Sequence, residues 1–121
     1  MKHFIIVLFS LLVICVTGQE KLHAYATRMG HWNNSSKEYT WEDPKLASIN
    51  LTVTRDMIDI DDNNFSTYYC NEILLETEES MMFRATDHNQ KKCLVMMQFP
   101  EDGEHSIGID YGNYILVYFI E

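Results

Sequence analysis

The sequence has little proline, little glycine and few basic residues. Two prolines and five glycines are spread over 121 residues, and no repeat, linker or low-complexity run is present. One domain of modest size is therefore expected. Lysine and arginine total nine against 18 acidic residues, so the formal net charge is −9. Because such a chain is repelled by nucleic acid and by anionic membrane surfaces, we expect no nucleic-acid partner and a neutral or basic one.

Long hydrophobic runs are missing except at the start of the chain. A basic residue, Lys2, precedes an apolar run over residues 4–16, and small residues follow it. This layout is typical of a secretory signal peptide, and the run is shorter than the ~20 residues that cross a bilayer. We therefore expect residues 1–18 to be a signal peptide and residues 19–121 to form a single β domain in the periplasm or outside the cell. A signal anchor and lipidation at Cys15 are the alternatives.

Cysteine is scarce as well. Of the three cysteines, Cys15 belongs to the predicted signal peptide, which leaves Cys70 and Cys93. In an oxidising compartment this even count favours one disulfide, which would stabilise the fold by about 3 kcal/mol. Two buried free thiols on separate strands are the alternative.

Apolar and polar residues alternate with a period of two along the rest of the chain. In the return strand MIDID, for example, Ile58 and Ile60 face inward while Asp59 and Asp61 face outward. Strands are predicted in this way at residues 22–32, 47–54, 57–61, 65–76, 81–86, 92–99, 105–110 and 114–120.

These short strands, separated by turns and without a helical window, predict an all-β fold. We expect a single antiparallel meander of about eight strands that forms a small lipocalin-like barrel or a sandwich. The last strand, YILVYFI, is too short to span a membrane and is apolar on both faces. It should therefore lie centrally in the sheet or close a barrel against the first strand.

An acidic cluster follows the return strand. Asp59, Asp61 and Asn63 occupy positions one, three and five of an EF-hand-like loop. Position six is Asn64 where glycine is needed, position twelve is Cys70 where glutamate is needed, and no helices flank the cluster. We therefore predict a solvated strand face, with weak cation binding by Asp59, Asp61 and Asn63 as the alternative.

Motifs for catalysis and metal binding are missing. The sequence contains no H-x-H, H-E-x-x-H or G-x-S-x-G pattern and no cysteine–histidine spacing typical of zinc sites. Lys91 and Lys92 precede Cys93 and would lower its thiol pKa, although pairing or burial of this cysteine is the stronger expectation in a secreted chain. The sequence therefore predicts no catalytic residues, no cofactor and a binding function.

Gly30-His31-Trp32 lies in the first predicted strand. This G-x-W pattern is similar to the one that lipocalins carry, although their second and third motifs are missing here. The resemblance implies that Trp32 closes the floor of a barrel that binds a small apolar ligand. A tryptophan that simply packs on a strand is the alternative.

A longer pattern covers about the whole mature chain. The segments CVTGQE, SINLTVTRDMIDIDD, FRATDHNQKKCLVMMQF and SIGIDYGNYILVYFIE together resemble small exported proteins of Bacteroidetes, especially Flavobacteria-type species. The positions that carry the resemblance are Asp87, Lys92, Cys93, Val95, Ile109, Tyr111, Tyr114, Tyr118 and Ile120. They form strand patterns rather than chemical motifs. The resemblance implies a small exported β domain and assigns no functional residues.

These features together favour a non-enzymatic exported domain that binds a small apolar ligand or an envelope protein. The high negative charge supports an alternative, in which the chain is an acidic inhibitor or immunity-type protein that acts on a basic partner.

Overall fold

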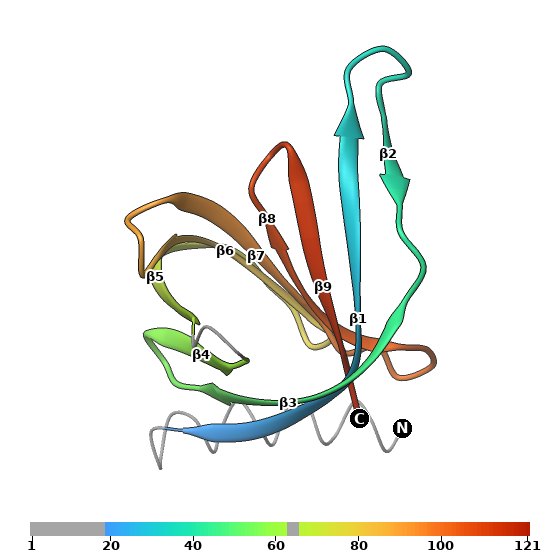
Figure 1. Cartoon of the computed structure of the whole chain (residues 1–121). Coiled ribbons are helices and arrows are strands. Elements are labelled where there is room, and N and C mark those ends of the chain that lie inside the picture. The colour runs from blue at the N-terminus through green and yellow to red at the C-terminus, as the bar shows by residue number, and fades with distance from the viewer. Residues whose placement is uncertain (1–18, 63–65) are drawn as a thin grey trace.

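The computed structural model describes residues 19–62 and 66–121, which form nine strands and, within these ranges, no helix (Figure 1). No helix in this part of the chain has the length and apolarity needed to cross a bilayer. In chain order the strands are β1 (Glu20–Asn33), β2 (Glu38–Trp41), β3 (Lys45–Val53), β4 (Met57–Asp61), β5 (Ser66–Glu76), β6 (Ser80–Asp87), β7 (Lys92–Gln98), β8 (His105–Asp110) and β9 (Tyr114–Ile120).

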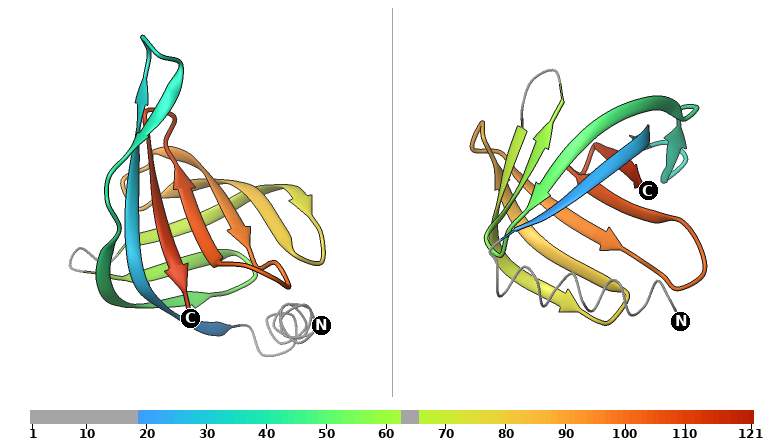
Figure 2. Two further views of the ribbon diagram at one scale, coloured as in Figure 1. Left: turned by 90° about the vertical axis from the view of Figure 1, so that its right-hand side faces the viewer. Right: turned by 90° about the horizontal axis from the view of Figure 1, so that it is seen from below.

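Eight of the strands close into an antiparallel barrel. β1, β3 and the strands from β4 to β9 pair in that order, and β9 pairs back with β1 from Ala24↔Ile120 to His31↔Tyr114. Figures 1 and 2 show this wall from three directions. The predicted meander and barrel are confirmed, and the sandwich is not formed. The last strand closes the barrel against the first, as its two apolar faces predict.

β2 is an extra strand outside the closed wall. It pairs with the end of β1 from Gly30↔Trp41 to Asn33↔Glu38, and the resulting hairpin projects beyond the barrel (Figure 1). The sequence pattern predicted no strand between residues 32 and 47, so β2 was missed. β2 is held by its pairing with β1. Gly30 of β1 makes room for the Trp41 ring of β2, since a Cβ at position 30 would lie only 2.9 Å from that ring.

β1 contains a bulge that reverses which side chains face the core. Its pairing with both β3 and β9 shifts between Ala24 and Ala26. Before the shift, Ala24 lies opposite the core residue Ile120, whereas beyond it Gly30 lies opposite Ile115. Because side chains alternate along β9, Ile115 points away from the core. The far half of β1 therefore presents Gly30 and the neighbouring aromatic residues of the hairpin on the outer face.

Buried apolar side chains inside the barrel form one core cluster. Every strand of the wall contributes to it, with side chains such as Ala24, Leu51, Ile58, Tyr68, Phe83, Val95, Ile107 and Tyr118. The inward positions predicted for Ile58 and Ile60 are confirmed, since these side chains are 1% and 0% exposed. Tyr68 of β5 and Tyr118 of β9 belong to this core, whereas Tyr69 is exposed.

One polar cluster is buried at the end of the barrel where β6 and β8 finish. Asp87 is 3% exposed, and its Oδ2 accepts a hydrogen bond from Tyr111 Oη at 2.7 Å. Its Oδ1 accepts the amides of Asn89 and Lys91 at 2.8 and 2.9 Å. Burial raises the pKa of Asp87. The hydrogen bonds and the nearby His88 together lower this pKa by more than burial raises it, so it lies below its ordinary value.

Candidate functional site

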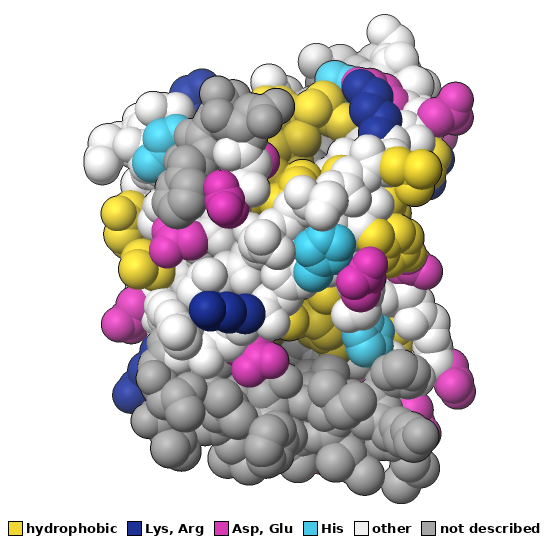
Figure 3. Space-filling view, turned by 60° about the horizontal axis from the view of Figure 1, so that its bottom comes forward, with side chains coloured by type: hydrophobic (Ala, Val, Ile, Leu, Met, Phe, Trp, Pro, Cys, Tyr) yellow, Lys and Arg dark blue, Asp and Glu magenta, His cyan; other side chains and the backbone are white. Residues whose placement is uncertain are grey.

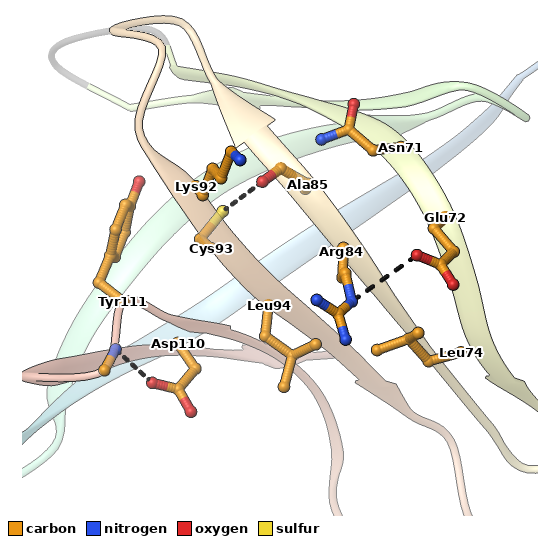
Figure 4. A pocket seen from close by; sticks show the side chains of 11 residues that line it. Asn71, Glu72, Leu74, Arg84, Ala85, Lys92, Cys93, Leu94, Asp110 and Tyr111 are labelled. Atoms are coloured by element: carbon orange, nitrogen blue, oxygen red, sulfur yellow. Dashed lines mark hydrogen bonds and ion pairs between the residues drawn. The ribbon is translucent and has the colours of Figure 1, made fainter.

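An open pocket of about 650 Å³ lies over β5, β6, β7 and the end of β8 (Figure 4). We call it the outer pocket. Glu72, Arg84, Leu94 and Asp110 are successive register partners across these four strands. Since side chains alternate along each strand, this row lies on the opposite face from the buried core. The pocket is therefore a feature of the outside of the barrel.

Ionic groups of both signs surround an apolar part of the outer pocket. Arg84 Nε lies 3.8 Å from Glu72 Oε2, and both side chains are mostly exposed, so this ion pair contributes little to stability. Lys92 adds a second cation, and Leu74 and Leu94 supply the apolar contact area. Such a mixed surface can bind an extended chain segment that carries both charged and aliphatic side chains.

The β1–β2 hairpin is tied to one side of the outer pocket. Tyr39 Oη on β2 lies 3.4 Å from both Asp110 Oδ1 and the Gly112 carbonyl oxygen. Asp110 Oδ1 also accepts the Gly112 amide at 2.7 Å, in a turn where Gly112 has φ +92°. Partial burial, and then the negative charge of Asp110, raise the pKa of Tyr39. Tyr39 therefore stays a neutral hydroxyl that braces Asp110 in place.

Cys93 lies behind the outer pocket and is buried. Burial raises the pKa of its thiol to about 11, with a further contribution from the carboxylates of Asp87 and Asp110. The two preceding lysines do not produce the lowered pKa that the sequence suggested. Because the thiolate is the nucleophilic form, this thiol is unreactive at neutral pH.

Beyond the outer pocket, β5 continues past the end of its neighbour β4. The β4–β5 pairing ends at Met57↔Tyr69, and the Cys70 amide then donates to the Asp56 carbonyl at 2.8 Å. Residues 71–76 have β6 on one side, and no other strand of the described ranges pairs with their second edge. We call residues 71–76 the open edge segment.

Three consecutive apolar side chains of the open edge segment are exposed. Ile73, Leu74 and Leu75 are 48%, 40% and 43% exposed as whole residues. Leu74 also lines the outer pocket, so the two features form one continuous surface. Figure 3 shows that hydrophobic side chains elsewhere on the barrel also reach the surface among acidic ones, on the underside.

The sequence matches no protein-family model, and no curated protein or solved structure is significantly similar to it. The function is therefore inferred from the geometry of the chain itself.

The predicted disulfide between Cys70 and Cys93 is wrong, because both thiols are free. Each cysteine is a register partner of Ala85, Cys70 from β5 and Cys93 from β7. They are therefore two strand spacings apart, or roughly 10 Å, whereas a disulfide needs Cα atoms within about 7 Å. Of the two interpretations drawn from the sequence, free thiols on separate strands is the correct one.

Trp32 does not close the floor of the barrel. It lies on the projecting β1–β2 hairpin and is 38% exposed, with its ring edge-to-face against Tyr39 at a centroid distance of 5.1 Å. Its Nε1 donates a hydrogen bond to Asn34 Oδ1 at 2.8 Å. The bulge in β1 and the length of this strand carry Trp32 beyond the closed wall, so it packs on a strand surface, as the alternative proposed.

The acidic residues of β4 do not assemble a cation site in the described structure. Asp59 accepts a hydrogen bond from Thr67 Oγ1 at 2.7 Å, and Asp61 is exposed at the end of the strand. Asn63 lies outside the described residues. Across residues 19–62 and 66–121, no three histidine, cysteine or acidic side chains are grouped so that they could hold a metal ion.

Neither the outer pocket nor the open edge segment was predicted from the sequence. A signal for the segment was present, since a predicted strand of five residues (57–61) is followed by one of twelve (65–76). The longer strand must extend past the shorter one on one side. The pocket had no such signal, because its residues come from four strands whose registers the sequence does not reveal.

Proposed function

We propose that this chain is an exported, non-enzymatic binding protein that recognises another protein through the outer pocket and the open edge segment. The observation that carries the proposal is the exposure of Ile73, Leu74 and Leu75 on a segment of β5 whose second edge pairs with no strand of the described residues. An apolar stretch on an unpaired edge is a surface to which another chain can add, and contiguous exposed apolar side chains often mark interaction sites.

A protein partner fits the structure better than a small apolar ligand. Small-ligand sites are usually concave and largely apolar, and they enclose most of the ligand. Here the buried apolar side chains inside the barrel pack into one core cluster, and the outer pocket is open and bordered by charged side chains. An open surface with aliphatic and ionic groups is typical of contact with another protein.

The predicted signal peptide supports a site of action in the periplasm or outside the cell. The charge of the chain supports a narrower form of the proposal, in which the protein inhibits a basic partner. Glu72 and Glu76 lie on the open edge segment, and Glu78 and Glu79 follow in the next turn. These carboxylates would attract a cationic surface and speed its association at low salt.

A photo-crosslinking experiment in the producing cell tests the proposal. A photoreactive phenylalanine analogue replaces Leu74, and the matched control carries it at Leu46, which is 93% exposed on β3. We expect one predominant adduct from position 74 and none from position 46. The adduct partner, once purified, should bind the wild-type chain and fail to bind the Leu74→Lys variant. Absence of a specific adduct, or equal binding by that variant, would overturn the proposal.

A further inference from the structure

We infer that the partner contributes an extended segment with apolar and basic residues, and that this segment adds as a strand to the free edge of β5. This inference rests on the proposed function and specifies its mode of recognition. Strand addition uses main-chain hydrogen bonds for affinity and side-chain contacts for specificity. The open edge segment offers both kinds of contact.

The free edge is long enough to hold a strand. It begins after the Cys70 amide, which still donates to the Asp56 carbonyl, and continues to Glu76. At about 3.4 Å per residue, residues 71–76 extend about 20 Å, which matches a strand of average length. The added segment would lie beside β5 in line with β4, in the space that β4 leaves open because it begins only at Met57, opposite Tyr69.

Lysine and proline, two of the usual devices that protect an edge strand, are missing from this one. Natural sheets block edges with lysine, proline, a covering loop or a bulge. Residues 71–76 contain neither lysine nor proline. The segment does contain register shifts against β6, between Cys70 and Glu72 and between Ile73 and Leu75. These shifts coil the strand locally, and Ile73, Leu74 and Leu75 remain exposed.

The negative charges of the open edge segment disfavour a second copy of this chain as its partner and favour a partner strand with basic residues. Glu72 and Glu76 flank the three apolar residues. Antiparallel pairing of two copies centred on Leu74 would align the apolar residues but place Glu72 of each copy opposite Glu76 of the other. Like charges directly opposite destabilise a pair of strands, whereas lysine or arginine at these positions would stabilise it.

The free edge of β2 is a less suitable site for strand addition. β2 has four residues, and its two large aromatic side chains already pack within the hairpin. Tyr39 contacts Trp32, and Trp41 covers Gly30 while the Arg28 guanidinium lies 5.4 Å from its ring centroid. This strand instead supplies a matched control position, because Glu38 is an exposed glutamate on a second edge.

Peptide binding to the purified chain tests the inference. The probe is an acetylated, amidated peptide of sequence Lys-Val-Lys-Leu-Lys-Val. Its comparison peptides replace lysine by glutamate, or carry N-methyl groups on alternate backbone nitrogens. Binding is measured by titration calorimetry at low salt, and protection of the amides of residues 71–76 is measured by hydrogen exchange. We expect the basic peptide to bind and to protect these amides, and both comparison peptides to bind at least about tenfold more weakly.

Charge-reversed variants locate the interaction. The Glu72→Lys/Glu76→Lys double variant should weaken binding of the basic peptide by about tenfold or more, whereas Glu38→Lys on β2 should leave it nearly unchanged. Equal binding of the N-methylated peptide would overturn strand addition. Equal binding by the double variant, or no binding of the basic peptide, would overturn the assignment of this edge and its basic occupant.

The two proposals fail in different ways. If position 74 gives a specific adduct in cells but the basic peptide neither binds nor protects β5, the chain binds a protein by another mode and only this inference is wrong. If the cellular adduct is also missing, the proposed function fails as well.

Discussion

The hydroxyl of Tyr111 donates a hydrogen bond to Oδ2 of Asp87 across 2.7 Å. The bond connects the end of β8 to the end of β6, and the Tyr68 hydroxyl lies 3.5 Å from that of Tyr111. The same carboxylate accepts two backbone amides of the β6–β7 turn. One buried acidic side chain therefore holds together two turns at the same end of the barrel.

We predict that Tyr111→Phe destabilises the protein by about 1.5–3 kcal/mol, because it removes a hydrogen bond to a buried charged group. The free energy of unfolding is measured by urea denaturation. Tyr114→Phe is the matched control, since Tyr114 stacks on Tyr111 with a centroid distance of 5.0 Å and the change keeps that ring contact. The control should change stability by no more than about 0.5 kcal/mol. Equal effects of the two substitutions would contradict the role given to the Tyr111–Asp87 bond.

Acid should destabilise the fold partly through Asp87. Its pKa is lower in the folded protein than its ordinary value, so the unfolded chain binds the proton more readily. Asp87 makes its full contribution to stability when the pH is above its pKa in the unfolded chain. This contribution is lost as the pH falls from that value through the pKa of Asp87 in the folded protein. We predict that Asp87→Asn flattens the dependence of unfolding free energy on pH between about pH 5 and pH 2.

Tyr111→Phe should flatten the same pH profile by a smaller amount, because it removes only one of the hydrogen bonds that lower the pKa of Asp87. The profile is obtained from urea denaturation at successive pH values. An Asp87→Asn variant with the slope of the wild-type chain in this range would show that other groups control acid unfolding.

The two thiols should react at very different rates. Cys70 is half-buried and Cys93 is buried, and burial raises the pKa of both. We predict that iodoacetamide at pH 8 modifies Cys70 slowly in the folded protein, and modifies Cys93 only after unfolding in urea. Peptide mapping by mass spectrometry without reductant measures both sites. A peptide pair linked by a Cys70–Cys93 disulfide would contradict the register of β5, β6 and β7.

Trp41 should be sensitive to any side chain added at Gly30. A Cβ at this position would meet Trp41 Cε3 and Cζ3 at 2.9 Å, so the exposed indole must move. We predict that Gly30→Ala costs about 1–2 kcal/mol and changes tryptophan fluorescence.

A double-mutant cycle with Trp41→Ala checks the cause. Once the indole is removed, Gly30→Ala should cost much less, which would give a coupling free energy of about 1 kcal/mol. Additive effects of the two substitutions would show that the cost comes from the backbone rather than from the ring.

Strand positions could be predicted well from the sequence where one face is buried. Residues 57–61 and 114–120 were predicted as strands with the bounds that β4 and β9 have in the structure. β2 could not be predicted in this way, because its side chains are largely exposed and its pairing with β1 is a tertiary contact. Lys37 has φ +59° in the turn before β2, which the sequence does not signal.

Relationships between strands were harder to predict than the strands themselves. Whether Cys70 and Cys93 can form a disulfide depends on the distance between them, which is two strand spacings in this barrel. A count of cysteines does not reveal that distance. Trp32 was assigned to the barrel floor because Gly30-His31-Trp32 resembles the lipocalin G-x-W pattern, and this pattern does not reveal the bulge between Ala24 and Ala26 that reverses the alternation along β1. The open edge segment depends only on the unequal lengths of β4 and β5, and these lengths were visible in the sequence.

The closing contact between β1 and β9 determines when this barrel can form. β9 is the final strand of the barrel, and its partner β1 is the first, so their pairing joins residues about as far apart as the domain permits. Contacts between distant parts of a chain slow folding, because the intervening loop must be ordered first. During synthesis, β1 and β8 each keep an unpaired side until β9 has emerged. Unpaired strand edges favour aggregation, and in this barrel the pairing of the seven-residue strand β9 removes two of them at once.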